Sequence, residues 1–373
     1  MKIIIKIYSV IFISLIITSL ASLTTFAIET ETLDEDIQNE LADIIDNDVK
    51  EVLEKIGITD FSPDEIYNIS FDNITNYFSE TLKDKTVKYF RSFFGLLSIV
   101  IICSIFASIF SFDKSDRYSA ICSIIIILSA VNLISSSVSA TVSVLESSGK
   151  FALSFAPIYT LLISLSGNTA SALTYNTFIV FLGELISSVI SLGLSDFIGV
   201  YFCLGISFAM NETANLSRYI SIVNKVIGTL LGFSASIFTG FLSIRSVLSV
   251  TLDSVSVKGI RFLISSMIPI VGSSISDAYS SLVGSINLIK GSVAFVGIIV
   301  IIIINLPVLL ENLVTYISFS MLSYMAESFI SQRTAEILRF FAGGIRILLL
   351  LCLFEMFIII ITVGVMLSVR GGA

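Results

Sequence analysis

The chain of 373 residues contains no histidine and no tryptophan, and only 13% of its residues are charged. Without histidine, Ser-His-Asp hydrolases, HExxH metalloproteases and most zinc sites are excluded. The four cysteines, Cys103, Cys122, Cys203 and Cys352, lie inside apolar runs and lack the spacing of a metal site. These features favour a protein without a metal site. We also expect no enzyme activity, no cofactor and no nucleic-acid partner.

Apolar residues are in excess instead, because 55% of the chain is hydrophobic and the mean hydropathy is +0.98. In soluble domains about 25% of the residues are charged, which is about twice the 13% of this chain. A globular core could not bury so much apolar surface. The composition predicts an all-α, polytopic transmembrane helical bundle.

The first 27 residues have the pattern of a secretory signal peptide. Lys2 and Lys6 precede an apolar stretch from Ile7 to Leu20, and small residues precede the expected cleavage after Ala27. The alternative is an uncleaved first span. In either case the segment that follows is expected outside the cytoplasm.

Residues 28–92 differ from the rest of the chain in charge. They hold 17 acidic and 6 basic residues, a net charge of −11, against −8 for the whole chain. Apolar residues recur at helical spacing between Leu33 and Ile56, and Ser62-Pro63 is typical of the start of a second helix. The pattern predicts a small acidic helical extracytoplasmic region, either a solvated face or a docking module.

Residues 93–373 alternate apolar stretches with short polar breaks and form the expected membrane domain. We predict seven to nine true spans, because some stretches are shorter than the roughly 20 residues that a straight span needs and are expected to be broken or re-entrant. The apolar stretches are 93–112, 118–138, 151–167, 170–192, 196–211, 226–248, 262–282, 291–310, 313–330 and 345–369.

Small residues recur at every fourth position in three of these stretches, which places each set on one helix face. The sets are Gly228, Gly232, Ser236 and Gly240; Gly183, Ser187 and Ser191; and Ser135, Ser139, Ser143 and Ser147. Such faces allow close helix packing, either within one subunit or between subunits of a homo-oligomer. The sequence does not separate these alternatives.

The stretch SSMIPIVGSSISDAYSSL, residues 265–282, is of membrane-helix length but is interrupted and polar. Pro269 should kink or break a helix, and a broken helix at membrane depth is tolerated only inside protein or beside water. The hypothesis is a bent element that lines a polar conduit, formed by Pro269, Gly272, Ser273, Ser276 and Asp277. The alternatives are a re-entrant or interfacial helix end and a serine-rich packing face.

Other polar residues interrupt apolar runs. Glu184 and Glu355 are intramembrane acids, which could couple to ions but could equally serve as structural hydrogen-bonding groups. Asn305 and Pro307 are expected to end the run VGIIVIIIINLP. Pro157 repeats the local context of Pro269 and suggests a second broken helix in an inverted repeat.

Residues 211–282 carry the most specific pattern of the chain, and through it the sequence resembles the stage III sporulation protein AE family of endospore-forming Firmicutes. The pattern consists of Lys258, Arg261, Phe262, Ser266, Pro269, Val271, Gly272, Ser276, Asp277 and Ala278. The order of a secretory start, a short acidic region and many spans agrees with this resemblance, which extends over essentially the whole chain.

The resemblance implies a permease-like, multi-pass component of the mother-cell membrane. It would belong to the channel or secretion complex that links mother cell and forespore, together with other membrane proteins, a forespore-side partner and a cytoplasmic ATPase. The resemblance brings no catalytic residues. The alternatives are a self-sufficient secondary transporter that uses Asp277, Glu184 and Glu355, and a purely structural membrane scaffold.

Overall fold

The computed structural model describes four long helices and several shorter pieces of the chain. The described residues are 54, 91, 93–106, 109, 115–191, 199–204, 207, 272–330 and 332–367, with helical positions between 221 and 240. The predicted signal peptide, the acidic region apart from Glu54 and Arg91, and Pro269 lie outside them. The described part is helical and holds no strand, as the sequence predicts.

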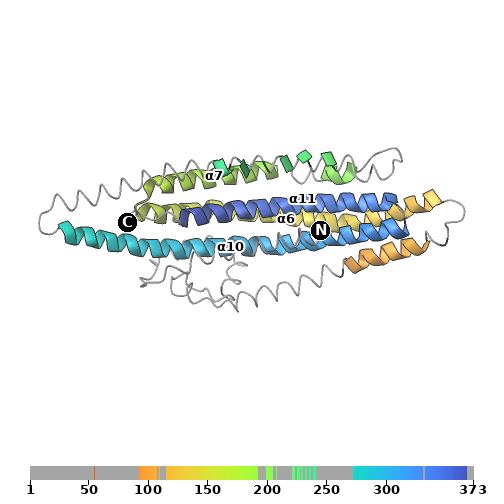
Figure 1. The fold of residues 1–373 in the computed structure, drawn as a ribbon, viewed down its shortest axis with the longest axis horizontal. Coiled ribbons are helices and arrows are strands. Elements are labelled where there is room, and N and C mark those ends of the chain that lie inside the picture. The colour runs from red at the N-terminus through yellow and green to blue at the C-terminus, as the bar shows by residue number, and fades with distance from the viewer. Residues whose placement is uncertain are drawn as a thin grey trace.

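The long helices lie side by side in an elongated bundle (Figure 1). They are α6 (Ser115–Leu165), α7 (Thr169–Ser191), α10 (Gly272–Phe329) and α11 (Gln332–Leu367). At 1.5 Å per residue, α10 with its 58 residues is about 87 Å long and α6 with 51 residues about 76 Å. Both greatly exceed the roughly 30 Å of a bilayer's hydrocarbon layer.

Three helices are long and apolar enough to cross a membrane, within Ile121–Leu165, Val283–Phe329 and Gln332–Val365. The described residues therefore support a membrane protein but do not confirm seven to nine spans. The break predicted at 139–150 is wrong, because α6 continues through it and through Pro157. Serine, threonine, glutamate and lysine at these positions are compatible with a helix, and polarity alone does not end one.

The break predicted between the stretches 291–310 and 313–330 is also wrong. Helix α10 continues through Asn305 and Pro307 to Phe329 and joins the two stretches. Helix α11 likewise begins at Gln332, well before the predicted start at 345. A proline in a long helix costs one backbone hydrogen bond, and the packing of neighbouring helices offsets that cost here.

The turn between α6 and α7 agrees with the predicted boundary at 167–170. Gly167 has φ of 84°, a conformation that favours glycine. The Gly167 N–H bonds the Ser164 carbonyl, and the Asn168 N–H bonds the Ile163 carbonyl. This pair of bonds is a Schellman motif, which ends α6 and reverses the chain into α7.

Side-chain pairs fix the register of the bundle. Helices α6 and α11 run parallel. Near the beginning of each helix the Ser123 and Thr334 hydroxyls lie 2.8 Å apart, and further along both helices Thr141 lies beside Cys352. Helix α10 runs antiparallel to both, and the Ser136 hydroxyl donates to the Glu311 carboxylate across the α6–α10 contact.

Two clusters of buried apolar residues fill the bundle. One joins the second half of α6, α7, the central part of α10 and the second half of α11. The other joins helix 93–106, the first half of α6, segment 199–204 and the end of the bundle where α10 turns into α11.

At three glycines a neighbouring side chain packs closely against the helix backbone, in the space that a Cβ would occupy. Leu153 packs against Gly183, the Phe155 ring against Gly297, and Tyr201 and Phe202 against Gly344.

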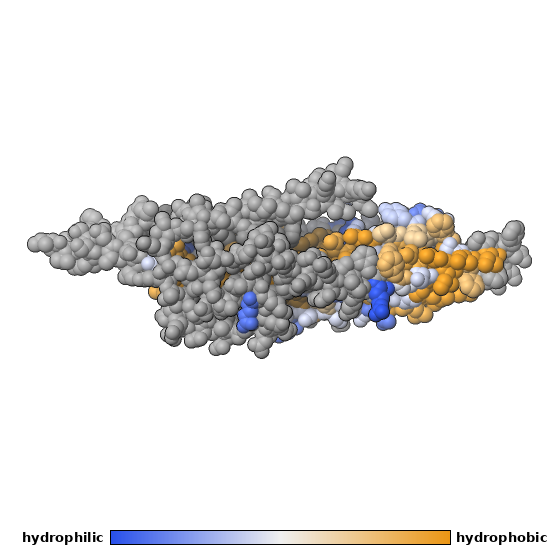
Figure 2. Space-filling model, turned by 90° about the horizontal axis from the view of Figure 1, so that it is seen from below, coloured by the Kyte–Doolittle hydropathy of each residue, from blue (hydrophilic) through white to orange (hydrophobic). Residues whose placement is uncertain are grey.

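Large apolar side chains are exposed at the end of the bundle where α10 turns into α11, and we call this surface the apolar end. Figure 2 shows it where helix 93–106 covers the bundle. It includes Phe94, Ile101, Ile102, Ile105, Phe106, Ile109, Ile121, Ile124, Ile125, Leu128, Val131, Leu313, Ile317, Met321, Tyr324 and Phe329. Exposed apolar surface of this extent is typical of contact with lipid or with another membrane protein.

Candidate functional site

Polar side chains form a buried seam along the contact of α6, α10 and α11, and we call it the polar seam. Helix α6 contributes Ser137, Thr141 and Ser148, α10 contributes Asn305 and Asn312, and α11 contributes Cys352, Glu355 and Thr362. Thr141 and Ser148, Asn305 and Asn312, and Glu355 and Thr362 are each seven residues apart. That spacing keeps each pair on one helix face in a bundle of nearly parallel helices.

Two amide groups of α10 cross-link this helix to α6. Asn305 Nδ2 donates to Ser148 Oγ at 2.8 Å, and Asn312 Nδ2 donates to Thr141 Oγ1 at 2.9 Å. Buried polar groups are costly unless they are hydrogen-bonded, so these two bonds favour one register of α10 against α6. A shift by one residue would break both bonds.

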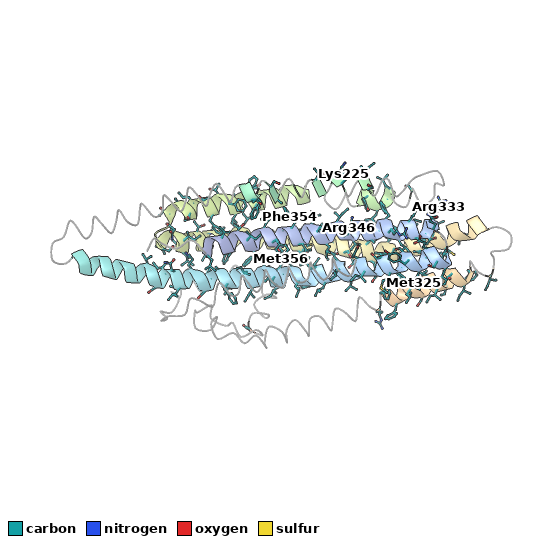
Figure 3. The ribbon with its side chains drawn as sticks, viewed as in Figure 1. Lys225, Met325, Arg333, Arg346, Phe354 and Met356 are labelled. Atoms are coloured by element: carbon teal, nitrogen blue, oxygen red, sulfur yellow. The ribbon has the colours of Figure 1, made fainter. Side chains whose placement is uncertain are left out.

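Glu355 brings the third helix into the seam. Its side chain is 5% exposed, and the Asn305 amide and the Ser148 hydroxyl lie beside it. Neither group is aligned for a hydrogen bond to Oε1 or Oε2. Figure 3 labels Phe354 and Met356, which flank Glu355 on α11, in the central part of the bundle.

The exposed side of α6 between residues 132 and 150, beside the polar seam, is polar, and we call it the α6 polar face. The Ser136–Glu311, Thr141–Asn312 and Ser148–Asn305 contacts place this part of α6 beside residues 305–312 of α10. Its exposed residues are Asn132, Ser135, Ser136, Ser139, Ser143, Glu146, Ser147 and Lys150. Glu146 and Lys150 form an exposed ion pair one turn apart.

The facing helices are strongly apolar at the level of the later part of this face, from Ser143 to Lys150. Residues 293–310 of α10 read VAFVGIIVIIIINLPVLL, and residues 347–363 of α11 read ILLLLCLFEMFIIIITV. Several of their outward side chains are only partly buried, among them Ile302, Ile304, Leu353 and Phe354. At one level the bundle therefore exposes hydroxyl and charged groups on α6 and apolar groups on α10 and α11.

The structure does not bring the predicted intramembrane acids together. Glu184 is exposed on α7, whereas Glu355 is buried between α6, α10 and α11. Gly272, Ser273, Ser276 and Asp277 lie in the first turns of α10, where the structure describes the backbone alone. The predicted conduit element at 265–282 therefore stays a prediction.

The small residues of the first predicted stripe are exposed. A Cβ at Gly228, Gly232 or Gly240 would meet no described atom within 4 Å, and the Ser236 hydroxyl donates to its own helix at Gly232. The serines of the α6 stripe are exposed as well. Of the glycines in the three stripes, Gly183 makes a close contact with a described side chain, that of Leu153.

The polar seam was not recognised as a site from the sequence, although Asn305 and Glu355 were singled out separately. The signal that could have found it is the repeat of polar residues at intervals of seven in three apolar stretches. The sequence could not show which stretches lie side by side, and so the polar residues of different helices could not be matched.

Comparison with known proteins gives the family of the chain. Residues 55–369 match the family model described as stage III sporulation protein AE. A relative of that name from Bacillus subtilis (strain 168) is 25% identical over 345 residues, which cover 87% of this chain and 79% of the relative. No solved structure matches. The matched residues include all four long helices, and the chain therefore belongs to the stage III sporulation protein AE family.

Proposed function

We propose that this chain is a permease-like, multi-pass component of the channel or secretion complex that links the mother cell and the forespore. Membership of the family implies a role in sporulation. The proposal adds a place in the mother-cell membrane and partners that include other membrane proteins, a forespore-side protein and a cytoplasmic ATPase. In this proposal the chain has no enzyme activity and acts as a structural part of a transport path.

The observation that supports the proposal is the α6 polar face, whose part from Ser143 to Lys150 is level with the apolar stretches of α10 and α11. In a bilayer those stretches set the depth of the hydrocarbon layer. Charged and polar side chains at that depth almost always face protein or a water-filled cavity. The α6 polar face is therefore the side of the bundle that turns toward a conduit or a neighbouring subunit.

A purely structural scaffold would use the same face in another way, because partner helices would cover it and exclude water. A self-sufficient transporter would need its coupling acids in one site, and Glu184 and Glu355 are not neighbours. The observations thus favour a component of a larger assembly. The homo-oligomer predicted from the small-residue stripes is compatible with either use of the face.

Cysteine accessibility in the assembled complex tests the proposal. Single cysteines are placed at Ser139 and Ser143 on the α6 polar face, with Leu350, exposed on the apolar side of α11, as the matched control. A water-soluble maleimide applied to sporulating cells should label the first two positions and leave Leu350→Cys unlabelled. Labelling of Leu350→Cys without Ser139→Cys would reject the assigned orientation.

A second measurement separates a conduit from a scaffold. If partner helices cover the α6 polar face, Ser139→Cys should be labelled in the isolated protein and become silent in the complex. If the face lines a conduit, labelling should persist in the complex, and Ser143→Leu should reduce sporulation while the complex still assembles. Flux through the purified chain alone would favour the transporter instead.

A further inference from the structure

Buried oxygen atoms at Glu355 and Asn305 have no hydrogen-bond donor among the described groups. Both Glu355 oxygens and Asn305 Oδ1 are buried, and no described group forms a hydrogen bond with them. A carboxylate accepts hydrogen bonds at two oxygens and an amide oxygen accepts up to two. Buried acceptors without partners are rare in folded proteins and require an explanation.

Both amide donors of Asn305 are already used by other acceptors. The Asn305 amide has two N–H groups, and it donates to the Ser148 hydroxyl and to the Ile301 carbonyl at 2.8 and 3.0 Å. The Asn312 amide, two turns away on α10, donates one N–H to Thr141. Beside the carboxyl the remaining donors are the Ser148 hydroxyl, whose oxygen already accepts from Asn305, and the weakly donating Cys352 thiol. The site is therefore rich in oxygen acceptors, and a bound positive charge would satisfy them.

The chemistry of the oxygens indicates the kind of ligand. Carboxylate, amide and hydroxyl oxygens are hard ligands that suit hard cations and protons, whereas soft metals prefer thiolates. One carboxylate balances one positive charge, and a net charge buried in a bundle is strongly disfavoured. A divalent ion would need further acids, and no cluster of acidic or cysteine side chains surrounds Glu355 among the described residues.

We propose that Glu355, Asn305 and Ser148 form a binding site for one small positive charge, a sodium ion or a proton, inside the three-helix contact. The site takes one oxygen-bearing side chain from each of α11, α10 and α6. Its occupation would stabilise the pairing of these helices by satisfying the Glu355 and Asn305 oxygens together. This inference rests on the polar seam and stands whether or not the chain belongs to a conduit.

Thermal unfolding of the full-length chain in detergent tests the site in two arms. In the sodium arm, NaCl replaces choline chloride at constant pH and ionic strength. In the proton arm, the pH is lowered in sodium-free buffer. The groups of α6 and α10 beside Glu355 are the neutral Ser148 hydroxyl and Asn305 amide. On α11 the titratable neighbour of Glu355 is the Cys352 thiol.

The wild-type chain should gain at least about 2 °C in Tm in one of the two arms, which also identifies the ligand. Glu355→Gln replaces the carboxylate by an amide that brings its own donors and no charge, so its Tm should no longer respond in that arm. The matched control is Glu184→Gln, which removes an exposed acid on α7 and should respond as the wild type does.

Two results would overturn the proposal: a wild-type Tm that responds in neither arm, or a Glu355→Gln variant that responds as strongly as the Glu184→Gln control. If Glu355→Gln does not accumulate, Ser148→Ala removes one oxygen of the site and should reduce the wild-type shift. An unchanged shift in Ser148→Ala would likewise reject the site.

The native Cys352 gives an independent readout one turn from Glu355. With the other three cysteines replaced by serine, the rate of Cys352 modification by a thiol reagent should fall several-fold when the ligand is bound. A rate that is the same with and without the ligand would contradict the proposal, because a bound cation ties together the helices around this thiol.

Discussion

The side-chain amide of Asn305 on α10 donates to the hydroxyl of Ser148 on α6 across 2.8 Å, although the two residues are 157 positions apart. Seven residues further along α10, Asn312 repeats the arrangement with Thr141. The two bonds connect the hairpin of α10 and α11 to α6, within a contact whose buried side chains are mostly apolar. The alignment of these long helices therefore depends on a few buried polar residues.

The Asn312–Thr141 bond should contribute a measurable coupling energy. Asn312→Ala and Thr141→Val each lower the free energy of unfolding, because each leaves one buried polar group without its partner. In a double-mutant cycle the coupling should be about 0.6 kcal/mol, the average for hydrogen bonds between membrane helices, and no more than about 1.7 kcal/mol. Unfolding in mixed detergent measures it, and Ser139→Ala on the exposed side of α6 is the control. Additive effects would show that the bond contributes nothing to the register.

Gly297 should not tolerate a side chain. A Cβ at this position would lie 2.6 Å from Cζ of Phe155, whose ring stacks between Phe151 and Tyr159 and cannot easily move. Gly297→Ala should cost about 1–3 kcal/mol of stability, as overpacking usually does. Thermal unfolding in detergent gives the value.

The matched control for Gly297 is Gly284 on the same helix, which is exposed and where a Cβ would meet no described atom within 4 Å. Gly284→Ala should leave the stability unchanged or raise it by up to about 1 kcal/mol, because alanine favours a helix more than glycine does. Equal effects of the two substitutions would contradict the close contact of α10 with α6.

The parallel pairing of α6 and α11 can be tested by a disulfide. Ser123 and Thr334 are buried, and their hydroxyl oxygens lie 2.8 Å apart. In a chain without its native cysteines, Ser123→Cys with Thr334→Cys should cross-link under mild oxidation, because such side chains approach the geometry of a disulfide. The pair Ser129→Cys with Thr334→Cys is the control. Efficient cross-linking of the control pair alone would show another register.

The ion pair of Glu327 and Arg339 should contribute little to stability, although it joins α10 to α11 near their turn. Both side chains are about 40% exposed, and Arg339 also lies over the Tyr324 ring. Glu327→Ala should change the free energy of unfolding by less than about 1 kcal/mol, since exposed ion pairs are screened by water. A loss as large as that of Gly297→Ala would mean that the turn depends on this pair.

Prediction from the sequence was accurate for the class of protein and inaccurate for the lengths of its helices. The boundary near Gly167 was predicted from the polar break between two apolar stretches, and glycine forms it there by a local mechanism. The stretch 139–150 was misread as a break between spans because it is too polar for a lipid-facing helix, although its serines were expected on one helix face. Residues on its buried side, such as Ser148, instead bond another helix, and those on its other side are exposed. Only the neighbours of a helix decide between these outcomes.

The sequence by itself determined that the chain is helical, apolar and a member of a sporulation family. Composition sets the solvent that a chain can enter, and the pattern around residues 211–282 is local in the sequence. The tertiary structure alone decided that Glu355, Asn305 and Ser148 meet, and that Glu184 stays apart from them. The physical reason is that register depends on contacts between residues far apart in the chain, where the cost of one buried polar group selects a single alignment among many apolar ones.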